Sequence, residues 1–158
     1  MSGSVRRLRP DEVKDYKAVR LAALADSPSA FTETLAQASM LADEVWAERV
    51  ESHNAGATAI IVADDGARLV GLAAGIPFEG RARVVSVWVD PAFRGRGLAA
   101  ALIEEVCAWA AGAGYAEIQI ETAIGNSGPR RIYERLGFEP TDIPPPAGCD
   151  PVLVRHLP

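Results

Sequence analysis

The chain has 158 residues, of which 49% are apolar, and a formal net charge of −5 at pH 7. This length and composition predict a single domain over residues 1–158 that is long enough to bury a core. The net negative charge argues against a general nucleic-acid-binding protein.

The sequence carries no sign of a disulfide framework, a metal site or a membrane anchor. Its two cysteines, Cys107 and Cys149, are too few for a disulfide framework, and no Cys or His spacing typical of a metal site occurs. No apolar run approaches the roughly 18 residues that a membrane-spanning helix needs, and no hydrophobic segment follows the N-terminal arginines as in a signal peptide. We therefore expect a cytoplasmic protein with no metal, no membrane contact and no nucleic-acid partner.

The N-terminal third is predicted to form a short strand and two helices. Residues 5–8 fit a short strand. A helix then opens at Pro10, carries apolar residues along one stripe, and ends before Ser27. After a loop, a second helix starts at Asp43, which fits the N-cap position, and ends near residues 53–56.

Three strands are predicted next, in an antiparallel meander. Residues 57–63 and 68–76 fit strands, and the sequence between them is typical of a hairpin turn. A second turn at residues 77–80 leads into a central strand at residues 82–89.

The central stretch, residues 84–106, reads VVSVWVDPAFRGRGLAAALIEEV and predicts a buried strand, a short turn and a helix. Its turn holds two glycines and two arginines at the start of the helix, where the first backbone N–H groups have no partner within the helix. Such a turn favours phosphate binding, because glycine lets the backbone approach closely and the helix N-terminus is positive. The alternative is that the glycines only make a tight strand-to-helix turn.

Residues 115–121 alternate as in a strand and complete a strand–helix–strand unit with the central strand and its helix. Because such crossovers give parallel neighbours, we expect residues 84–89 and 118–120 to lie side by side. A helix of about two turns is predicted with Pro129 at its first position and Gly137 as its C-terminal cap. A loop rich in Pro and Gly at 140–151 then leads into a last strand.

A dinucleotide-binding fold is a rival interpretation. Residues 95–100 also fit G-x-G-x-x-G/A, and Glu121 ends the next strand as a ribose-binding acid would. Against this, residues 90–94 separate the strand from the first glycine, whereas the dinucleotide turn is tight. The chain also lacks room for the second half of such a fold, so an NAD-type site is the weaker alternative.

The chain resembles the GNAT superfamily of N-acetyltransferases over residues 84–138. Residues 94–99, RGRGLA, satisfy every fixed position of the family's acetyl-CoA signature R/Q-x-x-G-x-G/A, and VDPAFR leads into it. The second signature is Asn126 followed seven residues later by Tyr133, within YERLGF. Both signatures occur in the family's order and separation.

The resemblance implies an α/β fold with six to seven mostly antiparallel strands, a splayed parallel central pair and about four helices. It also implies acetyl-CoA as the cofactor, with its pantetheine arm between the splayed strands, its pyrophosphate on the backbone amides of the turn, and Asn126 fixing its amide arm or the local backbone. Asn126 alternatively forms an Asx turn or a helix cap. The implied cofactor-binding residues are Val87, Trp88, Val89, Arg94, Gly95, Arg96, Gly97, Leu98, Ala99 and Asn126.

The resemblance further implies direct transfer of the acetyl group to an amine, with a backbone N–H of Val87 or Val89 stabilising the oxyanion. Tyr133 is the expected general acid, because a phenol with a pKa near 10 is protonated at neutral pH; its alternative role is a core aromatic. A base must deprotonate the amine, and either Glu79 or Glu121 is a candidate, although each also fits a solvated carboxylate.

The acceptor amine, a small molecule or a protein, is left open, and a homodimer is among the assemblies we expect. In this family the acceptor groove is lined by segments matching residues 27–46 and 141–150, whose acidic residues suit a cationic amine or simply a solvated face. The functional alternative is a module that binds acetyl-CoA without turnover.

Overall fold

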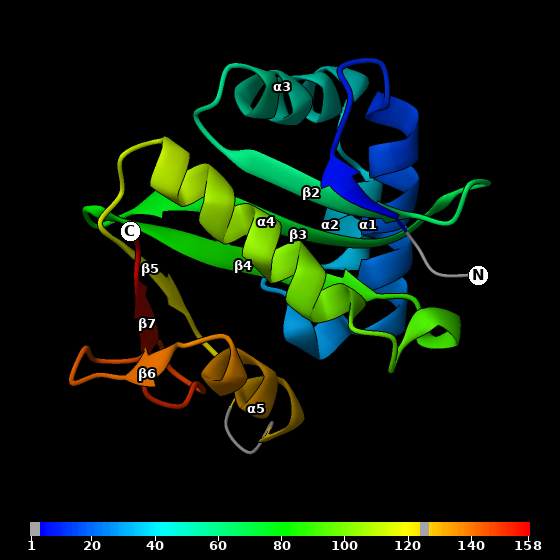
Figure 1. The fold of residues 1–158 in the computed structure, drawn as a ribbon. Coiled ribbons are helices and arrows are strands. Elements are labelled where there is room, and N and C mark those ends of the chain that lie inside the picture. Colours follow the sequence, from blue (N-terminus) through cyan, green and yellow to red (C-terminus); the bar gives the residue numbers. More distant parts are fainter. Residues whose placement is uncertain (1–3, 124–126) are drawn as a thin grey trace.

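The computed structural model describes residues 4–123 and 127–158. Within these ranges, seven strands form one sheet in the order β1-β2-β3-β4-β5-β7-β6 (Figure 1). The strands are β1 (Ser4–Arg7), β2 (Ala59–Asp64), β3 (Leu69–Phe78), β4 (Arg81–Val89), β5 (Glu117–Ile120), β6 (Glu139–Pro140) and β7 (Leu153–His156). β4 and β5 are parallel, and the other neighbours are antiparallel. The predicted α/β class with one parallel pair is thereby confirmed.

The described helices cover both faces of the sheet. They are α1 (Val13–Asp26), α2 (Leu35–Ser39), α3 (Asp43–Asn54), α4 (Leu98–Gly112) and α5 (Ser127–Arg135), with short 3₁₀ turns η1 (Pro28–Ala30) and η2 (Pro91–Phe93). Figure 1 shows α4 lying across one face of the central strands. Ile61 packs in the cluster beneath α4, whereas its neighbours Ile60 and Val62 pack with α1 and α3. Because both faces of β2 are covered, residues 59–63 of that strand are all apolar rather than alternating.

A glycine in β3 allows α4 to approach the sheet closely. A Cβ on Gly75 would lie 2.7 Å from the ring of Trp109, which is closer than real side chains come. The Trp109 indole N–H donates a hydrogen bond of 3.1 Å to the carbonyl of Gly56. The ring therefore fills the space that a larger residue in β3 would need.

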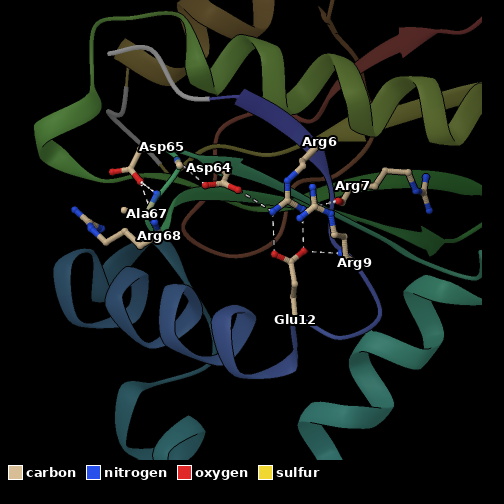
Figure 2. Close-up of polar contacts among 9 residues, drawn as sticks. Arg6, Arg7, Arg9, Glu12, Asp64, Asp65, Ala67 and Arg68 are labelled. Atoms are coloured by element: carbon tan, nitrogen blue, oxygen red, sulfur yellow. Dashed lines mark hydrogen bonds and ion pairs between the residues drawn. The ribbon is translucent and has the colours of Figure 1, made fainter.

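Arg6 clamps three elements together at the start of the chain (Figure 2). Its two terminal nitrogens each donate a hydrogen bond of 2.8 Å to the carboxylate of Glu12, just before α1. Nη2 also donates to Asp64 at the end of β2, at 2.9 Å. The hydrogen bond from Arg6 is the main reason that the pKa of Glu12 lies below its usual range. β1, β2 and the beginning of α1 are thus held by one guanidinium.

The segment predicted as a loop after α1 contains η1 and α2. Thr34 and Gln37 form a capping box, in which the Thr34 hydroxyl accepts from the Gln37 N–H at 3.1 Å and the Gln37 side chain accepts from the Thr34 N–H at 2.9 Å. The sequence signal T-x-x-Q was therefore present. α3 begins at Asp43 with Ala42 at the N-cap, so Asp43 is the first helical residue rather than the predicted cap.

Two further boundaries differ from the prediction. Pairing of β4 with β5 covers Ala82 beside Ile118 and Arg83 beside Gln119, so the expectation that residues 84–89 lie beside β5 is wrong. Beyond Arg83 a bulge bends β4, and the strands separate. Pro129 is the third residue of α5, not the first. No helix in the described ranges is both long and apolar enough to cross a membrane.

Candidate functional site

The turn between β4 and α4 exposes the first backbone amides of α4. Gly95 and Gly97 have φ of +78° and +79°, a left-handed conformation that glycine adopts without strain. A Cβ on either would meet no atom within 4 Å, so backbone conformation and not crowding accounts for these glycines. Gly97 is the N-cap and has no side chain to bind the amides that follow it. These N–H groups are therefore available to an anion.

The Arg94 side chain fastens the turn to α1. Its Nε donates to the carbonyl of Val89 at 2.9 Å, and its Nη2 donates to the carboxylate of Asp26 at 2.7 Å. The indole N–H of Trp88 donates to the same carboxylate at 3.0 Å. Hydrogen bonds from Trp88, Ser27 and Arg94 lower the pKa of Asp26. Arg94, one of the two arginines predicted beside phosphate, is thus bound by protein groups on two sides.

Arg96 lies over the aromatic ring of Phe93, with 5.2 Å from the guanidinium carbon to the ring centroid. Its Nη2 also lies 3.4 Å from the carbonyl of Ala92. Its positive charge therefore stays within the turn, close to the first amides of α4.

The open edge of β4 lies directly upstream of this turn. The N–H of Asp90 donates to the carbonyl of Val70 in β3 at 2.8 Å. Because backbone groups alternate along a strand, the N–H and carbonyl groups of Val89 and Val87 face the opposite edge, which β5 leaves unpaired beyond Arg83. The predicted splay is thus confirmed. Of the residues predicted to line the pantetheine arm, Val87 and Val89 face the open edge, whereas Trp88 pairs with Leu72 of β3.

A β-bulge shapes this open edge. Leu72 pairs with Trp88 and Ala74 pairs with Val85, so two residues of β4, Ser86 and Val87, lie opposite one residue of β3. Ser86 has a φ of +61°, which a residue with a side chain rarely adopts.

Tyr133 is buried on the α4 side of the sheet, with 8% of its surface exposed, in the same cluster as Val89 and Leu98. Its ring centroid lies 6.4 Å from that of Phe138. Burial raises the pKa of Tyr133 to about 12, so the phenol is protonated at neutral pH. Among the described residues, none makes a hydrogen bond to its hydroxyl. The side chain is therefore able to donate a proton to a bound group.

The two candidate bases lie in different places. Glu79 is exposed and lies in the β3–β4 turn, just before β4 begins. The glycine turn follows the other end of β4. Glu121 follows β5 where the strands separate, and its side chain is 7% exposed. Its carboxylate accepts hydrogen bonds from Arg83 Nε at 2.9 Å and Gln119 Nε2 at 3.0 Å. Asn126 lies outside the described residues.

Two features of the site had not been predicted. The buried hydroxyl of Thr122, one residue beyond Glu121, has no hydrogen-bond partner among the described residues. Arg20 of α1 donates to Ser86 at the bulge. Neither had a local sequence signal, because each depends on residues that only the fold brings together. In the described part of the chain, no group of three or more His, Cys, Asp or Glu is arranged to hold a metal ion.

The sequence is similar to known acetyltransferases. Residues 21–138 match the model of the acetyltransferase (GNAT) family. A segment of 62 residues is 36% identical to a protein of Methanocaldococcus jannaschii named as an uncharacterized N-acetyltransferase. That match covers 39% of this chain and 27% of the curated relative, so it spans only about a quarter of that protein.

The fold is similar to those of solved acetyltransferases. PaiA N-acetyltransferase from Thermoplasma acidophilum, in complex with coenzyme A, gives a TM-score of 0.77 at 14% identity, over 99% of both chains. A phosphinothricin acetyltransferase from Sinorhizobium meliloti, in complex with acetyl-CoA, gives 0.76 at 17% identity, over 99% of this chain and 89% of that chain. At these identities the likeness establishes the fold.

Proposed function

The chain belongs to the acetyltransferase (GNAT) family, and on that premise we propose that it transfers the acetyl group of acetyl-CoA to an amine. The observation that carries this proposal is the continuity of two features. The open edge of β4 at Val87 and Val89 leads directly into the uncapped amides of α4. An extended amide chain that ends in a pyrophosphate has the chemistry to occupy both.

The residues at this site suit acetyl-CoA. Strand edges bind extended peptide-like chains through backbone hydrogen bonds, and the pantetheine arm contains two amides that can pair in this way. The amides of residues 95–99 bind the pyrophosphate, with the positive end of the α4 dipole behind them. Acetyl-CoA supplies an acetyl group already activated as a thioester. Relatives solved with coenzyme A or acetyl-CoA support this assignment.

The backbone N–H of Val87 or Val89 stabilises the negative charge that develops on the carbonyl oxygen as the amine attacks. A fixed backbone dipole in a partly buried site is effective at this task because it needs little reorganisation. Removing such a donor costs roughly 100- to 1,000-fold in rate in other enzymes.

Tyr133 donates a proton to the departing thiolate. Its raised pKa, about 12, keeps the proton available throughout the physiological range. On the acceptor side, Glu121 takes the proton of the ammonium, directly or through water, because it lies where β4 and β5 separate. Glu79 has no part in this proposal, since it lies at the other end of β4.

A turnover assay tests the function. The purified protein is incubated with acetyl-CoA and a panel of small amines, amino acids and peptides, and free thiol is followed together with the acetylated product. The proposal predicts thiol release that depends on one class of amine. Binding of acetyl-CoA without turnover of any amine would indicate a sensing module instead. Binding of NAD in preference to coenzyme A would indicate the dinucleotide alternative.

A further inference from the structure

The bulge of β4 holds a residue in an unfavourable backbone conformation. Left-handed φ costs a residue with a Cβ roughly 1 kcal/mol or more, and this conformation persists only where the surroundings hold it. Ser86, with φ of +61°, is such a residue, and it directly precedes Val87. The direction of the Val87 N–H therefore depends on what holds Ser86.

Arg20 of α1 holds Ser86. Its Nη1 donates a hydrogen bond of 2.7 Å to the Ser86 hydroxyl, while Nε and Nη2 lie 3.3 and 3.2 Å from one carboxylate oxygen of Glu33. The guanidinium carbon also lies 4.7 Å from the centroid of the Phe31 ring. With 11% of its side chain exposed, Arg20 has few other conformations open to it.

Glu33 is itself fixed from a third element. Arg49 of α3 binds its carboxylate with two nitrogens, at 3.3 and 2.8 Å. The hydrogen bond from Arg49 is the main reason that the pKa of Glu33 is lowered. Bidentate Arg–carboxylate contacts define geometry as well as charge. The chain Arg49, Glu33, Arg20, Ser86 thus joins α3, the segment before α2, α1 and the bulge.

α1 also holds β4 on the other side of Val87. The carboxylate of Asp26, the last residue of α1, accepts the indole N–H of Trp88 at 3.0 Å. Arg20 and Asp26 therefore anchor the residues immediately before and after Val87. Neither contact touches the glycine turn amides, to which the cofactor's pyrophosphate is assigned.

We propose that Arg20 is a positioning residue for acetyl transfer: it holds Ser86 in the left-handed conformation and so directs the Val87 N–H toward the thioester carbonyl. This inference rests on the proposed function and adds to it the residues that set the oxyanion donor. Glu33 and Arg49 hold Arg20 in place. Through its contacts with Glu33 and Ser86, Arg20 connects the predicted acceptor segment, residues 27–46, to β4. Binding of coenzyme A through the α4 amides does not depend on this chain of contacts.

The test compares variants at both ends of the contact. Arg20→Ala removes the anchor, whereas Ser86→Ala removes its hydroxyl partner and leaves the contacts among Arg20, Glu33 and Arg49 in place. Ser86→Gly also loses the hydroxyl, but glycine adopts the same φ without strain. Arg155→Ala is the matched control, because Arg155 also forms an ion pair with a glutamate, Glu104 at 2.7 Å, outside this site.

The readouts are kcat with a reactive amine, the dissociation constant for coenzyme A, and the infrared carbonyl stretch of bound acetyl-CoA labelled with ¹³C at the carbonyl. The last needs no acceptor. In the wild type we expect this stretch to lie below that of free acetyl-CoA, because a hydrogen bond weakens the carbonyl bond. We expect Arg20→Ala and Ser86→Ala to lose most of that shift and about 10- to 100-fold in kcat, less than removal of an oxyanion donor. Coenzyme A affinity stays within about threefold, since the α4 amides are unchanged.

A double-mutant cycle makes the inference specific. Ser86→Gly is expected to lose less activity than Ser86→Ala, and adding Arg20→Ala to Ser86→Gly is expected to have little further effect. The inference is overturned if Arg20→Ala and Ser86→Ala keep the wild-type carbonyl shift and kcat. It is also overturned if Arg20→Ala lowers kcat as much in the Ser86→Gly variant as in the wild type. If the wild type neither binds acetyl-CoA nor transfers its acetyl group, the proposed function fails first, and the inference fails with it.

Discussion

Arg83 donates a hydrogen bond of 2.9 Å to the carboxylate of Glu121 at the point where β4 and β5 separate. The contact fixes a carboxylate at the entrance of the splay, whereas Glu79 lies exposed at the far end of β4. Glu121→Gln is therefore expected to lower kcat/KM for the amine at least about tenfold, a modest loss for a general base. Glu79→Gln, the matched control, is expected to change nothing. Thiol release at fixed pH measures both, and the opposite ranking would move the base to Glu79.

Tyr133→Phe removes the proposed proton donor and keeps the ring that packs beside Phe138. We expect a loss of about 100-fold or more in kcat, typical of general acid catalysis, with coenzyme A affinity retained. Because the pKa of Tyr133 is raised to about 12, wild-type activity should show no fall from phenol ionisation up to pH 10. A decline centred near pH 8 that Tyr133→Phe abolishes would contradict this role.

Gly97→Leu places a side chain on a left-handed residue at the start of α4. The strain costs roughly 1–2 kcal/mol in stability, and the side chain covers amides assigned to phosphate. Gly80→Leu is the control, because Gly80 has a similar φ of +83° in the β3–β4 turn. Both variants are expected to unfold at lower temperature, but only Gly97→Leu should lose the rise in unfolding temperature that coenzyme A produces. Equal responses to coenzyme A would place the pyrophosphate elsewhere.

The contact between Arg6 and Glu12 makes stability depend on pH. The hydrogen bond from Arg6 lowers the pKa of Glu12 in the folded state below the ordinary value of 4.5. The stabilisation is therefore complete above about pH 5.5 and is lost as the pH falls through the folded pKa. Glu12→Gln should cost about 1–2 kcal/mol at pH 7. Urea unfolding from pH 7 to pH 3 should show this difference shrinking; a constant difference would contradict the assignment.

Thr122→Val replaces a buried hydroxyl that has no partner among the described residues with a methyl group of similar size. Since an unpaired buried polar group is costly, the free energy of unfolding is expected to rise by about 1 kcal/mol. Thr122→Ser, which keeps the hydroxyl and removes the methyl group, should instead lower it. Urea unfolding at neutral pH measures both changes, and destabilisation by valine would mean that the hydroxyl is satisfied in solution.

The candidate donor site was predictable because the sequence signals for it are local. The glycine turn and the signature containing Tyr133 each occupy a few consecutive residues, so the glycines, the helix start and the buried phenol could be identified without a fold. The anchor on the bulge could not be, because Arg20 and Ser86 are 66 residues apart and no rule of spacing joins them. The left-handed conformation of Ser86 also has no sequence signal, since serine does not normally mark a left-handed position.

Errors at element boundaries have a similar physical origin. The extent of pairing between β4 and β5 is set by the bulge and the strand bend, which follow from tertiary contacts. β6 comprises only Glu139–Pro140, which is too short to show the alternation of apolar and polar residues that predicts a strand. α2 is different, because its capping box at Thr34 and Gln37 is a local sequence signal, although the segment lacks clear apolar periodicity.

The most direct test of the proposed acetyl-CoA site is an amide NMR titration of the ¹⁵N-labelled protein with acetyl-CoA. If acetyl-CoA lies along the open edge of β4 and on the α4 amides, the largest shift changes will occur at Val87, Val89 and residues 95–99, with smaller changes at β1 and β2. Changes concentrated elsewhere, for example around Trp109 in the last turn of α4 and around Gly56, with residues 95–99 unaffected, would contradict the proposed site.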